Sequence, residues 1–242
     1  MRPMSTFVLV HGAYHGAWCW YRLRPELEAR DHEVVTFDLP AHGIDGTSYG
    51  EATLEGYVDR VCEALEEPDD PPTLVGHSMA GMPITAAAER VPSRIDTLVY
   101  LTAYLPGDGE SMLDQRNEAS LVTRHFETDE ERGVGWVPDE WLDEAFYADC
   151  GPEDRALARS LVRPEPLDPI STPVEATEER FGSVRRAYVG CTEDRAITRQ
   201  QQEAMLEEHG ADRELTLEAS HSPFLSMPEA TADALETAAG RE

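Results

Sequence analysis

A serine placed to act as a nucleophile is the most informative residue of this 242-residue chain. Ser78 follows a short apolar run and lies among the small residues Gly76, Ala80 and Gly81. A strand that stops at such a sequence and turns sharply into a helix holds the serine hydroxyl clear of the sheet. The pattern differs from G-x-S-x-G by one added methyl group, because Ala80 stands where glycine is usual. The alternative is an ordinary turn in which Ser78 only caps the next helix.

A serine hydroxyl needs a base within hydrogen-bond reach, and an acid must hold that base in the right tautomer. In a parallel sheet such groups gather in loops at the carboxyl ends of the strands. His221 directly follows the last predicted strand, so we expect it to be the base, although it could also be a surface imidazole. The other histidines are less suitable. His32 precedes a strand, His125 and His209 lie outside these loops, and His77 adjoins Ser78. His11, His15 and His42 lie in such loops but occur early in the chain.

For the acid, Asp194 follows the penultimate predicted strand after a short turn, again at the carboxyl edge. Glu193 is its neighbour and the second choice, whereas Asp38 follows the second strand and precedes the serine. The oxyanion of an acyl-transfer intermediate also needs backbone donors. The Met79 N–H, at the start of the helix after Ser78, is one candidate, and the small-residue loop at 12–13 offers a second.

The elements that must position these residues alternate strictly at first. Apolar runs of strand length predict strands at 6–10, 33–37, 72–75, 97–101, 186–190 and 214–218. Helical spacing of apolar residues predicts helices at 18–30, 49–67, 82–89, 198–209 and 228–239. This order predicts an α/β fold with a mostly parallel sheet of about six strands that is covered by helices on both faces.

The alternation lapses between residues 105 and 182, where the chain is acidic and rich in proline. We expect this part to be an inserted helical cap, with helical pieces near 112–126, 139–148 and 152–161, and residues 1–104 and 183–242 to form the core. Its aromatic residues include Trp136, Trp141 and Phe146, and those that face the cleft would line an apolar substrate pocket together with His11 and Gly12. The alternative is that they only pack the cap on the core.

The formal net charge is −28, with 48 acidic residues against 20 basic ones, and every basic residue is arginine. Such a surface repels phosphate backbones and anionic lipids, which argues against nucleic-acid and membrane partners. Excess carboxylate without lysine is also expected of a protein adapted to high salt. A GC-rich genome would explain the missing lysine but not the acidic excess.

The first residues lead straight into an apolar strand without the features of a signal peptide, and no apolar run approaches transmembrane length. Four scattered cysteines without a C-x-x-C pair indicate reduced thiols and neither a disulfide framework nor a metal site. We therefore expect a cytoplasmic protein.

Several stretches together resemble one branch of the α/β-hydrolases, the branch of plant methyl esterases, hydroxynitrile lyases and small bacterial carboxylesterases. The order serine, aspartate, histidine along the chain is that of α/β-hydrolases. The resemblance covers nearly the whole chain, is weakest in the cap, and is closest to the bacterial members at the end. It is carried by residues 7–13, 15–20, 38–40, 76–81, 191–194 and 221–229.

The resemblance implies a cofactor-free serine esterase that acts on small carboxylic esters, such as short-acyl, aryl or methyl esters, with Ala13 and Met79 as the oxyanion donors. The lyase members carry threonine at the position of Ala13 and lysine at that of Ser222, so ester hydrolysis is favoured over cyanohydrin cleavage. Two alternatives stay open: a lyase or C–C hydrolase with the same triad, and a non-catalytic small-molecule receptor.

Overall fold

The computed structural model describes residues 5–240, and its centre is a six-stranded sheet in the order β2-β1-β3-β4-β8-β9. Every neighbouring pair in this sheet is parallel. The strands are β1 (Thr6–Val10), β2 (Glu33–Thr36), β3 (Thr73–His77), β4 (Thr97–Leu101), β8 (Arg185–Cys191) and β9 (Arg213–Leu217). The predicted parallel sheet is confirmed: β1 and β4 have the predicted bounds, and the other four strands differ from theirs by one or two residues at an end.

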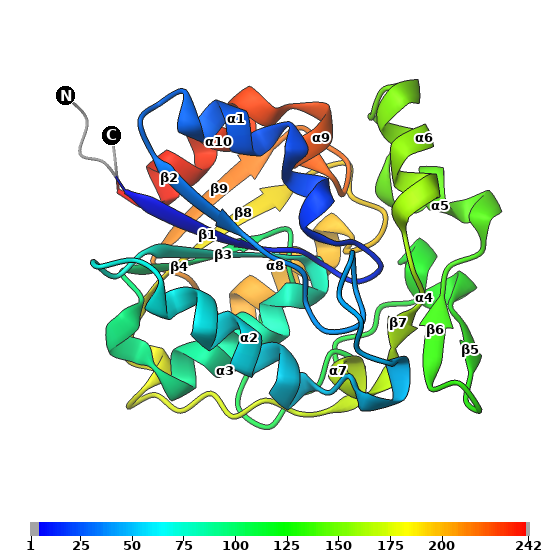
Figure 1. The fold of residues 1–242 in the computed structure, drawn as a ribbon, viewed down its shortest axis with the longest axis horizontal. Coiled ribbons are helices and arrows are strands. Elements are labelled where there is room, and N and C mark those ends of the chain that lie inside the picture. Colours follow the sequence, from blue (N-terminus) through cyan, green and yellow to red (C-terminus); the bar gives the residue numbers. More distant parts are fainter. Residues whose placement is uncertain (1–4, 241–242) are drawn as a thin grey trace.

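Helices cover both faces of the sheet (Figure 1). α1 (Leu23–Glu28) and α10 (Pro228–Ala238) pack together on one face, and α2 (Leu54–Glu66) and α3 (Gly81–Arg90) pack on the other. The chain also forms α8 (Arg199–His209), the short α9 (Pro223–Ser226) and the 3₁₀ turns η1 (Ala17–Tyr21), η2 (Tyr49–Glu51), η3 (Ser78–Ala80), η4 (Pro92–Arg94) and η5 (Phe181–Ser183). Predicted helix 18–30 is thus two pieces, η1 and α1.

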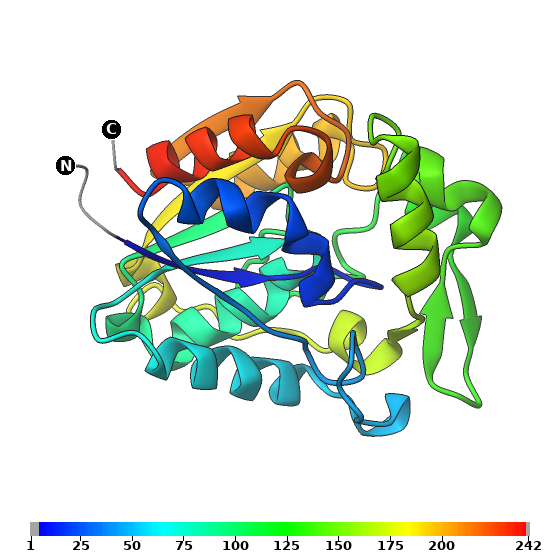
Figure 2. The ribbon, with the colours of Figure 1, turned by 45° about the horizontal axis from the view of Figure 1, so that its top comes forward.

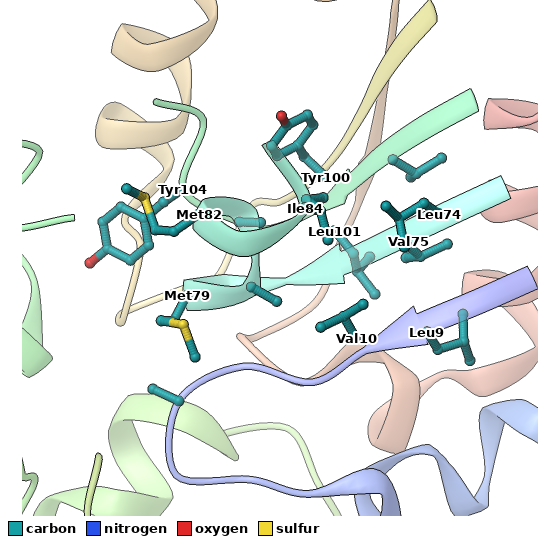
Figure 3. Packing of buried hydrophobic residues seen from close by; sticks show 14 of the residues in the cluster. Leu9, Val10, Leu74, Val75, Met79, Met82, Ile84, Tyr100, Leu101 and Tyr104 are labelled. Carbon is teal, nitrogen blue, oxygen red and sulfur yellow. The ribbon is translucent and has the colours of Figure 1, made fainter. Parts of the chain in front are cut away.

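The central strands are continuous apolar runs because both of their faces are covered. Every residue of β3 and β4 is buried, whereas exposure alternates along β9, an edge strand whose one partner within residues 5–240 is β8. The side chains on both faces of the sheet belong to one buried hydrophobic core. Figure 3 shows the part of this core around β1 and β3, with Leu9, Val10, Leu74 and Val75 packed beside one another.

Residues 105–182, which we call the cap segment, lie beyond the carboxyl ends of the strands for most of their length, in both views (Figures 1 and 2). They form more than the predicted helices. The elements are α4 (Leu121–His125), β5 (Glu127–Asp129), β6 (Val134–Trp136), α5 (Asp139–Phe146), α6 (Pro152–Leu161), β7 (Glu165–Pro166) and α7 (Leu167–Ser171).

The predicted helix at 112–126 is reduced to α4, and side-chain hydrogen bonds explain why. The Asn117 side chain accepts from the Ala119 N–H, and the Ser120 side chain accepts from the Thr123 N–H. Such local bonds offer the backbone an alternative to a helix, and the second one caps the N-terminus of α4.

A three-stranded antiparallel sheet in the order β5-β6-β7 was not predicted. Its strands have two or three residues each, too few for a periodic pattern. β6 leaves a turn at Gly133, whose φ is +65°, and Gly135 lies against the Phe126 ring, where a Cβ would come within 2.1 Å of that ring. This small sheet brings Glu165, in β7, into the buried interior of the molecule.

Candidate active site

The turn after β3 places Ser78 in a left-handed conformation, with φ of +57°. This costs a non-glycine residue roughly 1–2 kcal/mol, and such strain is typical of functional turns. The turn is close-packed: a Cβ on Gly81 would lie 1.8 Å from the Tyr104 carbonyl oxygen, and one on Gly76 would lie 2.6 Å from Ile84. The Tyr104 N–H donates to the Ser78 carbonyl at 3.0 Å. Packing and hydrogen bonding therefore hold the strained serine.

Ala80, the departure from the usual glycine, is fully buried with φ of −61° and ψ of −12°. This is the ordinary right-handed helical region, in which alanine has no strain. The extra methyl group is therefore compatible with the turn. The neighbouring Met79 lies at the turn that ends β3, on the side of the loop that follows Val10 (Figure 3).

His221 connects Ser78 to Asp194. Its Nε2 lies 2.9 Å from Ser78 Oγ, and its Nδ1 lies 2.6 Å from Asp194 Oδ2. Because a carboxylate only accepts, Nδ1 carries the proton and Nε2 is the acceptor for the serine hydroxyl. Ser78 is 9% exposed, His221 1% and Asp194 5%. The three residues come from the ends of β3, β8 and β9, so the structure brings together the residues selected from the sequence.

Asp194 is held by three further donors. Its Oδ1 accepts from the N–H groups of Ala196 and Ile197 at 2.7 and 2.9 Å, and its Oδ2 accepts from Thr102 Oγ1 at 2.5 Å. Hydrogen bonds to both oxygens stabilise a buried negative charge. The second choice for the acid, Glu193, is exposed to solvent.

The early histidines have structural contacts of their own. His11 accepts from the Leu39 N–H at Nε2 and donates from Nδ1 to the Gly12 carbonyl, while burial lowers its pKa well below 6.5. His15 donates to the Ala13 carbonyl at 2.7 Å and accepts from the Tyr147 hydroxyl, and burial lowers its pKa to about 4. Both are therefore neutral at pH 7.

The loop after β1 approaches the serine closely. A Cβ on Gly12 would lie 2.8 Å from the Cβ of Ser78 and 2.9 Å from the His77 carbonyl. The Ala13 N–H has no hydrogen-bond acceptor within residues 5–240. Its direction is fixed, because the peptide is trans and the Gly12 carbonyl on its opposite side accepts from His11. A backbone donor beside Ser78 is thus available to a ligand.

The three predicted cap aromatics lie in different places. The Phe146 ring is 5.5 Å from the His221 ring between centroids and is 3% exposed. Trp136 lines a cavity of about 180 Å³ together with Tyr14. Trp141 stacks on His125 within the cap segment, with ring centroids 3.8 Å apart. Of the three, Phe146 is the one whose ring contacts a residue of the Ser78 network.

Sequence reasoning missed three residues that contact this site. Thr102 and Tyr104 follow β4, so their place at the carboxyl edge was a usable signal. Glu165 had no such signal. Its carboxylate is fully buried and accepts from the Tyr14 N–H, one residue after Ala13, at 3.1 Å.

Outside this network, one group of side chains in residues 5–240 brings three possible metal ligands together: Glu110, Glu208 and His209. His209 Nε2 already lies 3.2 Å from Glu110 Oε2, and Glu208 is exposed. Within residues 5–240, no helix combines the length and the apolar character that a membrane span needs.

Residues 7–234 match the profile of the alpha/beta hydrolase family. The chain is 36% identical to salicylic acid-binding protein 2 of Nicotiana tabacum, over 95% of each chain. It is 34% identical to methylesterase 9 of Arabidopsis thaliana, over 96% of this chain and 97% of that one. The crystal structure of polyneuridine aldehyde esterase superimposes with a TM-score of 0.88 at 31% identity, covering 97% and 99% of the two chains.

Proposed function

Since this chain belongs to the alpha/beta hydrolase family and is an ester hydrolase, we propose that it cleaves small carboxylic esters through an acyl-enzyme on Ser78. The observation that carries this proposal is the continuous path from Ser78 Oγ through the His221 ring to Asp194. A serine, a base and an orienting acid in hydrogen-bond contact are the arrangement that acyl transfer needs.

In the first half-reaction, Ser78 Oγ attacks the ester carbonyl carbon while its proton passes to His221 Nε2. The Asp194 carboxylate stabilises the imidazolium that forms. The carbonyl oxygen becomes an oxyanion, and we assign its donors to the backbone N–H groups of Ala13 and Met79. The intermediate collapses when the bond to the alkoxy oxygen breaks, and the alcohol leaves with the proton from Nε2. An acyl group now occupies Ser78.

In the second half-reaction, a water molecule gives its proton to His221 Nε2 and attacks the acyl carbon. The same backbone donors stabilise the second oxyanion. Collapse of this intermediate returns the proton to Ser78 Oγ and releases the carboxylic acid. Ser78 again carries its hydroxyl proton and His221 is again neutral, so the next cycle begins from the same state.

The substrate is proposed as a small, uncharged ester with an apolar acyl or aryl group. Phe146 beside His221 supports an apolar environment at the reacting carbon, and the acidic surface disfavours polyanionic partners. The curated relatives include enzymes named methylesterase and methyl jasmonate esterase. The free thiols of Cys19, Cys62, Cys150 and Cys191 support a reducing compartment as its location.

The test is hydrolysis of a panel of p-nitrophenyl and methyl esters by the wild type and by Ser78→Ala. We expect the variant to lose about 10⁴-fold or more in kcat while staying folded. A fluorophosphonate probe should add its mass to the peptide that contains Ser78 and to no other. Ser160→Ala, an exposed helical serine, is the matched control and should keep full activity. Full activity of Ser78→Ala would refute the proposal.

Two compounds added to this panel separate the enzymatic alternatives. A cyanohydrin and a β-diketone report on lyase and C–C bond cleavage by the same triad. Turnover of these compounds above that of every ester would replace ester hydrolysis as the main activity.

A further inference from the structure

A carboxylate from the cap segment reaches the loop that carries the proposed oxyanion donor. Glu165 is fully buried, and its Oε2 accepts from the Tyr14 N–H at 3.1 Å and from His42 Nε2 at 2.9 Å. Its Oε1 accepts from the Tyr57 hydroxyl at 3.1 Å. Three core segments, the loop after β1, the loop after β2 and helix α2, are therefore bound to one side chain of β7.

The cap segment binds both backbone groups of Tyr14. The Tyr14 carbonyl accepts from the Arg163 N–H at 2.9 Å, while the Tyr14 N–H donates to Glu165. Tyr14 has φ of +68°, a left-handed conformation that costs a non-glycine residue roughly 1–2 kcal/mol. These contacts oppose relaxation of this strained residue, which directly follows Ala13.

Ala13 lies between two peptide groups with fixed orientations. The peptide before it is held by His11 through the Gly12 carbonyl, and the peptide after it is held by His15 at the Ala13 carbonyl and by Glu165 at the Tyr14 N–H. All of these peptides are trans. Without Glu165, the peptide after Ala13 keeps only the His15 contact and Tyr14 keeps only the Arg163 contact. The strained turn can then relax, which displaces Ala13 and the N–H that it carries relative to Ser78.

The charge on Glu165 has a partner. His42 donates from both ring nitrogens, to Glu165 and to the Pro40 carbonyl at 3.1 Å, which requires the protonated imidazolium. Burial lowers the pKa of His42, but the Glu165 carboxylate, the Pro40 carbonyl and Asp38 together outweigh burial, and the net change is upward. A buried ion pair often contributes little net stability to the fold. Stability alone therefore does not explain why the pair of Glu165 and His42 lies beside the loop after β1.

We propose that Glu165 is a positioning residue, through which the cap segment holds the Ala13 N–H in line with the oxyanion that develops at Ser78. This inference rests on the proposed function. It assigns to β7 a part in the chemistry, because the donor is correctly oriented only while the cap segment is packed on the core.

The test compares Glu165→Ala and Glu165→Gln with the wild type. Loss of a complete oxyanion donor costs about 10²–10³ in kcat, so a misoriented one should cost about 10–100-fold in Glu165→Ala. KM should change by less than about threefold, because the donor acts mainly in the transition state. Glu165→Gln keeps an amide oxygen for the Tyr14 N–H and should recover most of the lost kcat. It also keeps the test valid if Glu165→Ala fails to fold.

A second measurement addresses the transition state directly. A trifluoromethyl ketone forms a tetrahedral adduct on the serine, whereas the product acid does not. Glu165→Ala should weaken binding of the ketone by about the same factor as it lowers kcat. Inhibition by the product acid should stay nearly unchanged.

Asp154→Ala is the matched control. Asp154 is also a buried cap carboxylate that binds the core, through the Tyr21 hydroxyl and through Arg22 Nε at 2.7 Å, but it does not touch the loop after β1. Urea unfolding reports how much each variant loosens the fold. Asp154→Ala should lose stability and keep the wild-type kcat.

Two results would overturn the inference. One is an unchanged kcat in Glu165→Ala. The other is an equal loss of kcat in Glu165→Ala and Asp154→Ala at equal loss of stability, which would make Glu165 a purely structural contact. Both differ from failure of the proposed function, which is reported by Ser78→Ala alone.

Discussion

The imidazole of His77 donates from Nε2 to the backbone carbonyl of His221 across 2.9 Å, so the residue before Ser78 holds the residue whose ring faces Ser78. Burial lowers the pKa of His77 well below 6.5, and the electrostatic interaction with the nearby His221 is the next cause. The ring is therefore neutral, and its single proton lies on the nitrogen that faces the carbonyl. Serine and base are thus connected twice, once through side chains and once through this contact.

Replacement of His77 tests this second connection. His77→Phe leaves the buried His221 carbonyl without that donor, which costs about 1–3 kcal/mol of stability, and we expect kcat to fall about tenfold as the ring of His221 shifts. His77→Gln retains an N–H donor, so its stability and its kcat should lie between those of the wild type and those of His77→Phe. Urea unfolding and steady-state kinetics on a p-nitrophenyl ester measure both effects. Equal kcat in all three proteins would show that this contact does not orient the base.

A substitution at Gly12 tests how closely the loop after β1 approaches Ser78. A methyl group in Gly12→Ala would lie 2.8 Å from the Ser78 Cβ and 2.9 Å from the His77 carbonyl, so the loop or the turn must move. We expect at least about a 100-fold loss of kcat, the cost of one oxyanion donor. In Gly46→Ala the added methyl group has no atom within 4 Å, and this control should behave as the wild type. A fully active Gly12→Ala would contradict the geometry.

The pKa of His15 predicts a loss of stability in acid. Its folded-state value of about 4 lies below the unfolded value of 6.5, so the unfolded chain binds the proton first as the pH falls. The stabilisation is complete above pH 6.5 and is lost between pH 6.5 and 4, by about 3 kcal/mol.

The comparison with His15→Gln isolates this contribution, because the other titrating groups cancel in the difference. The difference in unfolding free energy between the two proteins should shrink by about 3 kcal/mol from pH 7 to pH 4. A difference that does not change with pH would mean that His15 also titrates near 6.5 in the folded protein.

The net charge of −28 predicts a dependence on salt. Repulsion among surface carboxylates is screened as the Debye length falls from about 10 Å at 0.1 M to about 3 Å at 1 M salt. We expect the thermal midpoint to rise between 0.1 and 2 M KCl, and to rise equally with NaCl. Equal midpoints at low and at molar KCl would exclude adaptation to salt.

The core and the Ser78 network were predictable because their signals are local. β1, β3 and β4 are continuous apolar runs, and Ser78, Asp194 and His221 each occur in the first few residues after a strand. In a parallel sheet these positions share one edge, so knowledge of the strands is enough to bring the residues together.

The cap segment was less predictable because its contacts are distant in sequence. Glu165 contacts His42, 123 residues away in the sequence, and Tyr14, 151 residues away. The sequence around Glu165 has no pattern that predicts either contact. The orientation of Phe146 toward His221, and of Trp141 toward His125, also depends on how α5 packs, which helical spacing alone does not specify.

The connection between His221 and Ser78 spans 143 residues, and β9, which positions His221, lies at the edge of the sheet next to β8. A nascent chain that has emerged from the ribosome as far as β4 therefore carries its serine without a base. It has no hydrolytic activity until β8 and β9 have been synthesised and have added to the sheet. Because such long-range pairing is slow, acquisition of activity should report one of the last steps of folding.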